Sequence, residues 1–91
     1  MLKIKNHIPS SKEYNFLGNA VGWGTYEEKC IKSSLKRSIF SVAVFDDRNV
    51  IAMGRIVGDL RLVYIIQDVI VLPEYQGKGL GRGIMDRIWI M

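Results

Sequence analysis

Apolar residues recur along the chain with two different spacings, and the changes of spacing delimit the predicted elements. Leu2 and Ile4 share one side of a short first strand, which Pro9 ends. Apolar residues spaced as one face of a helix then predict two helices, and three apolar strands and a third helix follow. These later elements are helices over 9–21 and 25–37, strands over 39–45, 50–59 and 61–72, and a helix that runs from 79 to 91.

Two capping signals support the first two helices. Ser10 or Ser11 is placed to cap the first helix, and Glu13 stands in its first turn. Thr25 and Glu28 have the T-x-x-E spacing of a capping box, in which the two side chains satisfy each other's backbone N–H groups. The sequence therefore predicts that the second helix begins just after Thr25.

The strand region contains three local signals. Residues 46–49 (DDRN) are typical of a turn, which makes the flanking strands a hairpin. Gly54 and Gly58 inside the second strand of that hairpin indicate a bulge or a close backbone approach. Segment 61–72 is apolar on both sides of its middle, which predicts a strand buried on both faces. The resulting order β-α-α-β-β-β-α predicts an α+β fold with a mostly antiparallel sheet flanked by helices.

Composition narrows the classes of function. The only cysteine is Cys30 and the only histidine is His7, which excludes an intrachain disulfide and a Cys/His zinc site, and we expect no metal. Cys30 is predicted to be a small buried apolar residue. The net charge of +4 is scattered along the chain, so we expect an ordinary solvated surface and no nucleic-acid partner. No signal peptide and no bilayer-spanning run is recognisable, so we expect no membrane partner and a cytoplasmic location.

The segment 71–83, VLPEYQGKGLGRG, carries the strongest functional signal. A strand, a glycine-rich turn and the start of a helix together make an anion site, because the first N–H groups of a helix have no partners within it. Lys78 and Arg82 add positive charge to this turn. The alternative is a strand-to-helix turn that binds nothing.

Two known phosphate motifs do not fit the segment, and a third does. A P-loop requires Ser or Thr where Gly79 follows Lys78, and the dinucleotide fingerprint requires a glycine where Arg82 stands. Gln76, Gly79 and Gly81 match the Q/R-x-x-G-x-G/A motif, and the segment resembles the acyl-CoA-binding motif of the GNAT superfamily of N-acetyltransferases. The order of the preceding elements is also similar to that superfamily.

The resemblance implies a co-substrate, acetyl-CoA, and direct transfer of its acetyl group to a primary amine of a small molecule or peptide. It assigns the pantetheine arm to the backbone of Val69, Ile70 and Val71, and the oxyanion contact to the Val69 amide. Gln76 completes the motif. The backbone groups that the resemblance assigns to the pyrophosphate are those of Gly77, Lys78, Gly79, Leu80, Gly81 and Arg82.

For the residues that would bind the acceptor amine and accept its proton, the sequence leaves alternatives open. Asp68 is the only acidic residue on its strand and is the candidate base, the alternative being a carboxylate bonded to neighbouring backbone or to an arginine. Arg55 and Asp59 either face an acceptor cleft or serve an ion pair or solvation. The aromatic residues that either line an acceptor pocket or pack in the core are Trp23, Tyr26 and Tyr64.

GNAT domains usually continue after this third helix with a strand, a helix and a hairpin. The resemblance therefore makes 1–91 a single domain that lacks the C-terminal β-α-β-β part, as a fragment, as a truncated product, or as a chain covered by a second copy. A homodimer would cover the apolar last turn of the helix. We expect weak or no transfer by the chain alone, and the alternative function is a non-catalytic half-domain that binds CoA or a partner protein.

Overall fold

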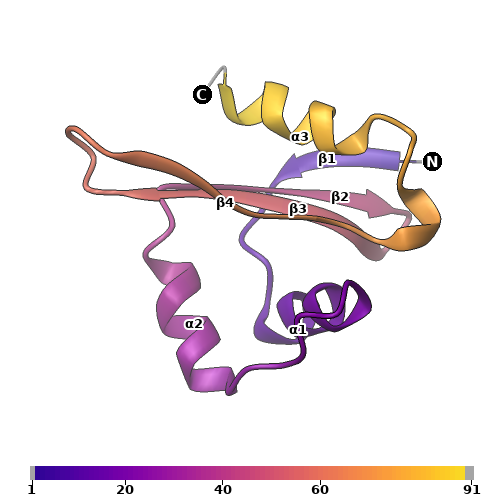
Figure 1. The fold of residues 1–91 in the computed structure, drawn as a ribbon, viewed down its shortest axis with the longest axis horizontal. Helices are drawn as coiled ribbons and strands as arrows, with labels where there is room; N and C mark the ends of the chain where they lie inside the picture. The colour runs from indigo at the N-terminus through magenta and orange to yellow at the C-terminus, as the bar shows by residue number, and fades with distance from the viewer. Residues whose placement is uncertain (1, 90–91) are drawn as a thin grey trace.

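A four-stranded antiparallel sheet separates the helices of this computed structural model into two layers (Figure 1). The structure describes residues 2–89, and the predicted order β-α-α-β-β-β-α is confirmed, with a short 3-10 helix added before the last helix. The elements are β1 (Leu2–Asn6), α1 (Ser11–Ala20), α2 (Glu28–Lys36), β2 (Phe40–Asp46), β3 (Asn49–Gly58), β4 (Tyr64–Val71), η1 (Pro73–Tyr75) and α3 (Leu80–Trp89).

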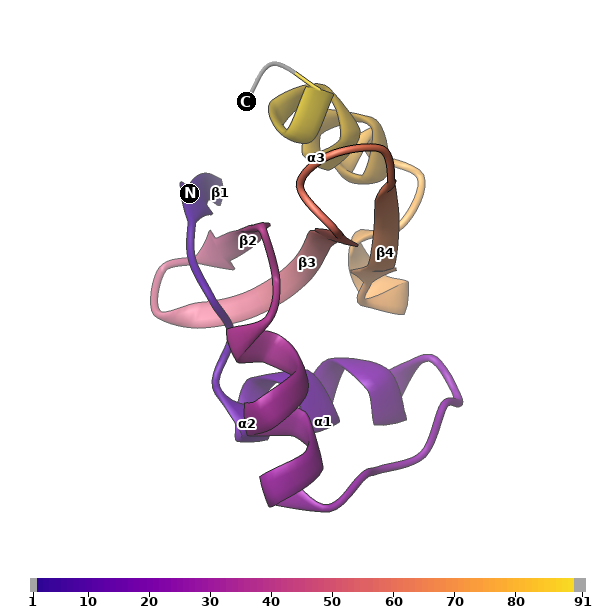
Figure 2. The ribbon, with the colours of Figure 1, turned by 90° about the vertical axis from the view of Figure 1, so that its left-hand side faces the viewer.

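The strands lie in the sheet in chain order, β1-β2-β3-β4, and every neighbouring pair is antiparallel. Helices α1 and α2 cover one face of the sheet and α3 covers the other, which two perpendicular views both show (Figures 1 and 2). The core is built mainly from β2 and β3, with Leu17 of α1 below them and Ile84 and Ile88 of α3 above.

The first helix begins as its sequence predicts. The Glu13 N–H donates to Ser10 Oγ at 3.1 Å, and the Ser10 N–H donates to Glu13 Oε1 at 2.8 Å. This reciprocal pair is a capping box with Ser10 as the N-cap. The same Glu13 oxygen lies 3.0 Å from His7 Nε2, so one carboxylate joins the end of β1 to the start of α1.

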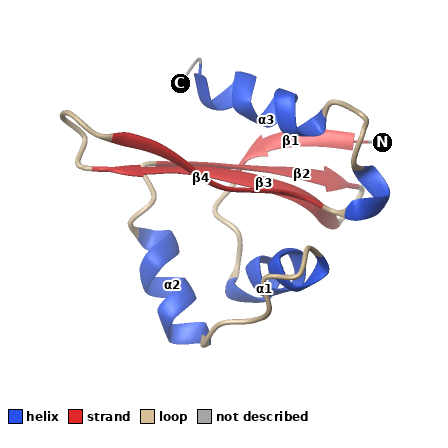
Figure 3. Cartoon of the chain, viewed as in Figure 1, coloured by secondary structure: helices blue, strands red, loops and turns tan. Residues whose placement is uncertain are grey.

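The capping box predicted for the second helix is wrong. Helix α2 begins at Glu28, three residues after Thr25, and its N-cap Glu27 makes no side-chain capping bond. Asn15 of α1 exchanges two hydrogen bonds with the backbone of Tyr26, at 2.9 and 3.0 Å, which ties the segment before α2 to α1. Glu28 meanwhile accepts from Ser11 Oγ at 2.9 Å, so its carboxylate links α2 to α1. Figure 3 shows these two helices on the same side of the sheet, joined by a loop.

The central strands β2 and β3 are buried on both faces, and the prediction that β4 has this environment is wrong. Residues 50–56 of β3 are buried without interruption, whereas Ile70 is the only buried residue of β4. The reason is sheet order. β3 lies between two neighbours and between both helical layers, while β4 is the last strand of the sheet and leaves Ile65 and Val69 exposed.

Both glycines of β3 are sites of close approach, as predicted. A Cβ atom at Gly54 would lie 2.6 Å from Ile84 Cγ2, so this glycine allows α3 to pack directly on the strand. A Cβ atom at Gly58 would collide with the Val63 carbonyl oxygen. Beside it, Asp59 Oδ1 accepts three backbone N–H groups of residues 61–63, so Asp59 organises the β3–β4 loop.

The last helix presents its predicted apolar face to the sheet. Ile84 and Ile88 are buried, while Trp89 is 84% exposed. Met91, predicted on the same face, lies outside the described residues. The homodimer contact expected at this end of the chain stays a prediction. Among residues 2–89, no helix combines the length and apolar character needed to cross a bilayer.

Replacing Gly54 by alanine is expected to destabilise the fold. The added methyl group would overlap Ile84, which is fully buried, so we expect a loss of about 1–3 kcal/mol in the free energy of unfolding. Urea denaturation measures it. Gly81→Ala is the matched control, because a Cβ there meets nothing within 4 Å and alanine favours a helix by up to about 1 kcal/mol. Equal stability of the two variants would contradict the close approach at Gly54.

Glu13 makes stability depend on pH. Burial acts to raise its pKa, but the Ser10 N–H and His7 outweigh this and lower the pKa below the ordinary 4.5. A carboxyl with a lowered folded-state pKa stabilises the fold fully above its ordinary pKa, and this contribution is lost as pH falls below it. The free energy of unfolding, measured from about pH 6 to about pH 3, should decline less steeply in Glu13→Gln than in wild type. Glu74→Gln, an exposed site, should leave the decline unchanged.

Candidate functional site

The glycine-rich segment connects the edge strand to the last helix and is tied back at its start. Gln76 Nε2 donates to the Val71 carbonyl oxygen at 3.0 Å, so this predicted ligand residue turns toward its own strand. The Tyr75 hydroxyl donates to Asp46 Oδ2 at 2.5 Å, which joins η1 to the end of β2. These two bonds fix where the loop leaves the sheet.

The Tyr75 bond has consequences for both partners. It is the leading cause that raises the pKa of Tyr75, and it is also the leading cause that lowers the pKa of Asp46. The Lys78 ammonium lies 5.3 Å from the centre of the Tyr75 ring, a cation–π contact. Tyr75 thus connects a strand end to one of the two cations of the loop, a role that the sequence pattern did not reveal.

The glycines leave the loop backbone facing open space. Gly77 and Gly79 have φ angles of 80° and 79°, in the region that glycine adopts most readily. A Cβ atom at Gly77, Gly79 or Gly81 would meet no atom within 4 Å. Gly81 has neither a positive φ nor a neighbour among the described residues that excludes a side chain. The backbone at Gly81 therefore borders open space, and it is left bare although a side chain would fit there.

Helix α3 starts within this open stretch of backbone. The Gly83 N–H donates to the Gly79 carbonyl oxygen at 3.0 Å, which is the first turn of the helix. The amides of Leu80, Gly81 and Arg82 precede it and have no carbonyl partner within the helix. The helix dipole adds partial positive charge at the same end, and Lys78 and Arg82 are exposed beside it. The predicted pyrophosphate-binding residues are thus brought together in one turn whose chemistry fits an anion.

A bulge interrupts β4 at the predicted catalytic residues. Met53 pairs with Ile70 and Arg55 pairs with Gln67, so Asp68 and Val69 together oppose Gly54 alone. Asp68 has a φ of 54°, in the left-handed region. A bulge of this kind takes one residue of the longer strand out of the ladder and re-aims its groups. The predicted oxyanion donor, the Val69 amide, therefore stands at an irregular point of an edge strand.

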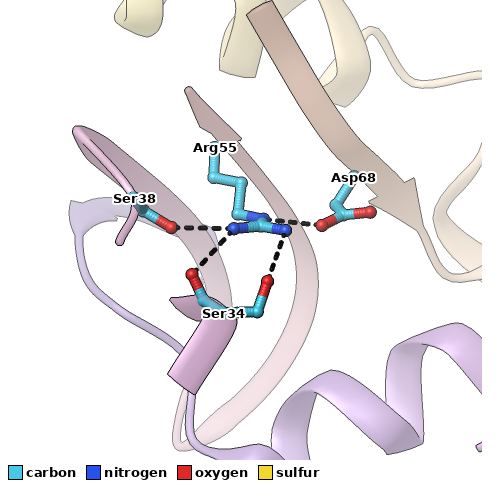
Figure 4. Close-up of polar contacts among 4 residues, drawn as sticks. All are labelled: Ser34, Ser38, Arg55 and Asp68. Atoms are coloured by element: carbon cyan, nitrogen blue, oxygen red, sulfur yellow. Dashed lines mark hydrogen bonds and ion pairs between the residues drawn. The ribbon is translucent and has the colours of Figure 1, made fainter. Parts of the chain in front are cut away.

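The Asp68 side chain lies in a buried ion pair (Figure 4). Arg55 Nε is 2.6 Å from Asp68 Oδ2, and each side chain is only 9% exposed. The other guanidinium nitrogens donate to the Ser34 carbonyl and hydroxyl oxygens and to Ser38 Oγ, at 3.1 to 3.3 Å. This geometry is the arginine-bonded carboxylate that the sequence left open as an alternative. The role of Asp68 as a base stays a prediction.

A pocket of about 200 Å³ lies between α1 and α2 beside this ion pair. Ser34 belongs to both, and burial followed by the charge of Asp68 raises the pKa of Tyr14 to about 12. The pocket thus brings an undissociated phenol close to Asp68. Its lining residues are Tyr14, Tyr26, Cys30, Ile31, Ser34 and Leu35.

This pocket and its surroundings correct two predictions, one about Cys30 and one about three aromatic residues. Cys30 is exposed on the pocket wall and is not a buried core residue, because Ile31 and Leu35 take the inward face of α2. Trp23, Tyr26 and Tyr64 do not pack in the core. Their exposed fractions are 45%, 56% and 52%, and only Tyr26 lines the pocket.

Known proteins resemble the chain in sequence and in fold. A family model described as an acetyltransferase (GNAT) domain matches residues 36–91. The uncharacterized N-acetyltransferase ycf52 of Gracilaria tenuistipitata var. liui is 30% identical over 76 residues, covering 79% of this chain. The chain spans 42% of the length of that relative.

Solved structures show the same fold. A probable acetyltransferase of unknown function from meticillin-resistant Staphylococcus aureus has a TM-score of 0.91 and 32% identity, over 98% of this chain and 67% of that chain. N-acetylglutamate synthase from Neisseria gonorrhoeae, solved with coenzyme A and N-acetyl-glutamate, has a TM-score of 0.74 at 13% identity, over 97% of this chain and 22% of that chain. The family match extends over more than half of the sequence, from the end of α2 through the glycine-rich loop, and the chain therefore belongs to the GNAT acetyltransferases.

Proposed function

We propose that the protein binds acetyl-CoA and transfers the acetyl group directly to a primary amine of a small molecule or peptide. The observation that carries the proposal is the open backbone, free of side chains, at Gly77, Gly79 and Gly81, where α3 begins with N–H groups that have no partner within the helix. Membership of the GNAT acetyltransferases supports acetyl-CoA as the acyl donor, and so does the coenzyme A bound to the N-acetylglutamate synthase.

In this proposal the glycine-rich loop and β4 bind different parts of acetyl-CoA. The amides of residues 77–82 bind the pyrophosphate, with Lys78 and Arg82 adding charge. The backbone of Val69, Ile70 and Val71 runs beside the pantetheine arm along the exposed edge of β4. The bulge in β4 presents the Val69 N–H, which donates a hydrogen bond to the thioester carbonyl oxygen as negative charge develops on it.

The acceptor enters from the side of the sheet that α1 and α2 cover. The pocket between α1 and α2 adjoins Asp68, is small and carries two tyrosines, which suits a compact amine or a single peptide side chain. The neutral amine attacks the thioester carbonyl carbon and a C–N bond forms. The C–S bond breaks with its electron pair on sulfur, so CoA leaves as the thiolate, and a proton of the amine nitrogen passes to a base. Asp68 is one candidate for this base.

Gly79→Asp is expected to weaken acetyl-CoA binding by more than about tenfold, because a carboxylate would stand where the pyrophosphate should lie. Isothermal titration calorimetry measures it. Gly24→Asp is the matched control, since Gly24 has a φ of 78° and open space like Gly79 but lies in the α1–α2 connection. Wild-type affinity should also fall with added salt. Unchanged affinity in Gly79→Asp would count against the whole site.

A second measurement separates transfer from binding alone. Release of free thiol from acetyl-CoA in the presence of a panel of primary amines supports the transferase. Binding of acetyl-CoA and CoA with no release by any amine supports the alternative, a CoA-binding module. Binding of a DNA duplex with no response to CoA would contradict both.

A further inference from the structure

Asp68 occupies a backbone conformation that needs support. Its φ of 54° is one that residues with a side chain adopt at a cost, although aspartate tolerates it better than most. In an edge strand, only one neighbouring strand is available to hold such a bulge in place. The support must therefore come from the side chain of Asp68 or from the layers above and below it.

Arg55 is built to give that support. It stands on β3 next to Gly54, the residue that opposes the bulge, and is itself buried. One edge of its guanidinium bonds Asp68, while the remaining nitrogens are bonded to Ser34 and Ser38 (Figure 4). A planar group that is held from two sides has little freedom to turn, so the position of the Asp68 carboxylate is fixed relative to α2.

The bulge is also bounded on its other face. The position of a Cβ at Gly54 is 3.5 Å from Val69 Cγ2 and 2.6 Å from Ile84 Cγ2, so Val69 and α3 meet over the bare backbone of Gly54. Arg55 on the side of α2 and α3 on the opposite side thus enclose the two bulged residues. A shift of Asp68 would move the peptide that carries the Val69 N–H.

We propose that Arg55 is a positioning residue that holds Asp68 in its left-handed conformation and thereby aims the Val69 N–H at the thioester carbonyl. This inference rests on the proposed function. It assigns the Asp68 carboxylate to the geometry of the bulge, and Arg55 acts on the reaction only through Asp68 and Val69.

Nuclear magnetic resonance of the ¹⁵N-labelled chain tests the proposal without requiring turnover. Acetyl-CoA and CoA differ only in the acetyl group, so a difference between the Val69 amide shifts in the two complexes reports the contact with the acetyl carbonyl. The amides of Gly79 and Gly81 report CoA binding and an intact fold in every variant. Wild type should show a loop response to both ligands and a Val69 difference between them.

Four variants and one matched control test whether Arg55 acts by positioning Asp68. Asp68→Gly adopts the left-handed conformation without a carboxylate and should keep the Val69 difference, whereas Asp68→Ala should lose it. Arg55→Met should also lose it, and the double variant Arg55→Met/Asp68→Gly should regain it, because glycine needs no arginine to hold the bulge. Asp47→Gly, a left-handed aspartate in the β2–β3 turn with a φ of 56°, is the matched control and should change nothing at Val69.

The outcomes discriminate clearly. Loss of the Val69 difference in Asp68→Gly, with normal loop responses, overturns the proposal, and so does failure of the double variant to regain it. If Arg55→Met does not fold, the comparison of Asp68→Gly with the double variant still decides. A wild-type loop that responds to neither ligand overturns the proposed function itself, and this inference with it. Loop responses without a Val69 difference in wild type overturn the inference alone.

Discussion

The buried ion pair between Arg55 and Asp68 connects the layers that shape the candidate site. Two opposite charges at 2.6 Å, each nearly excluded from water, are stable only together, since removing one leaves the other buried and unpaired. The pair joins β3 to β4, and the serines bound to Arg55 extend it to α2. The bulge, the pocket beside α1 and the path of the edge strand all meet at this one contact.

The elements that were predicted correctly depend on neighbours in sequence. The cap of α1 needs only Ser10 and Glu13, three residues apart, and the sequence displays both. The cap predicted for α2 failed although its spacing was equally good. Asn15 and Ser11, which lie 11 and 17 residues from their partners Tyr26 and Glu28, compete for the same segment. A local pattern contains no information about such partners.

The candidate site divides in the same way. The glycine-rich loop is contiguous, so its open backbone could be predicted from residues 76–82 alone. The partner of Asp68 is 13 residues away on another strand, and a left-handed aspartate leaves only a weak trace in a sequence. The apolar pattern of β4 predicts burial on both faces, yet the position of β4 at the edge of the sheet leaves much of it exposed. That order depends on pairing between strands, which periodicity cannot determine.

The ties at the start of the glycine-rich loop have a thermodynamic consequence. Gln76 is bonded to Val71, Tyr75 to Asp46, and the first turn of α3 closes on Gly79, so both ends of the loop are held before any ligand arrives. Glycine would otherwise lose more conformational entropy on ordering than any other residue. In this loop the conformational entropy is already lost when the protein folds. Binding of an anion therefore costs less entropy, and the affinity is higher than for a loop that must be ordered by its ligand.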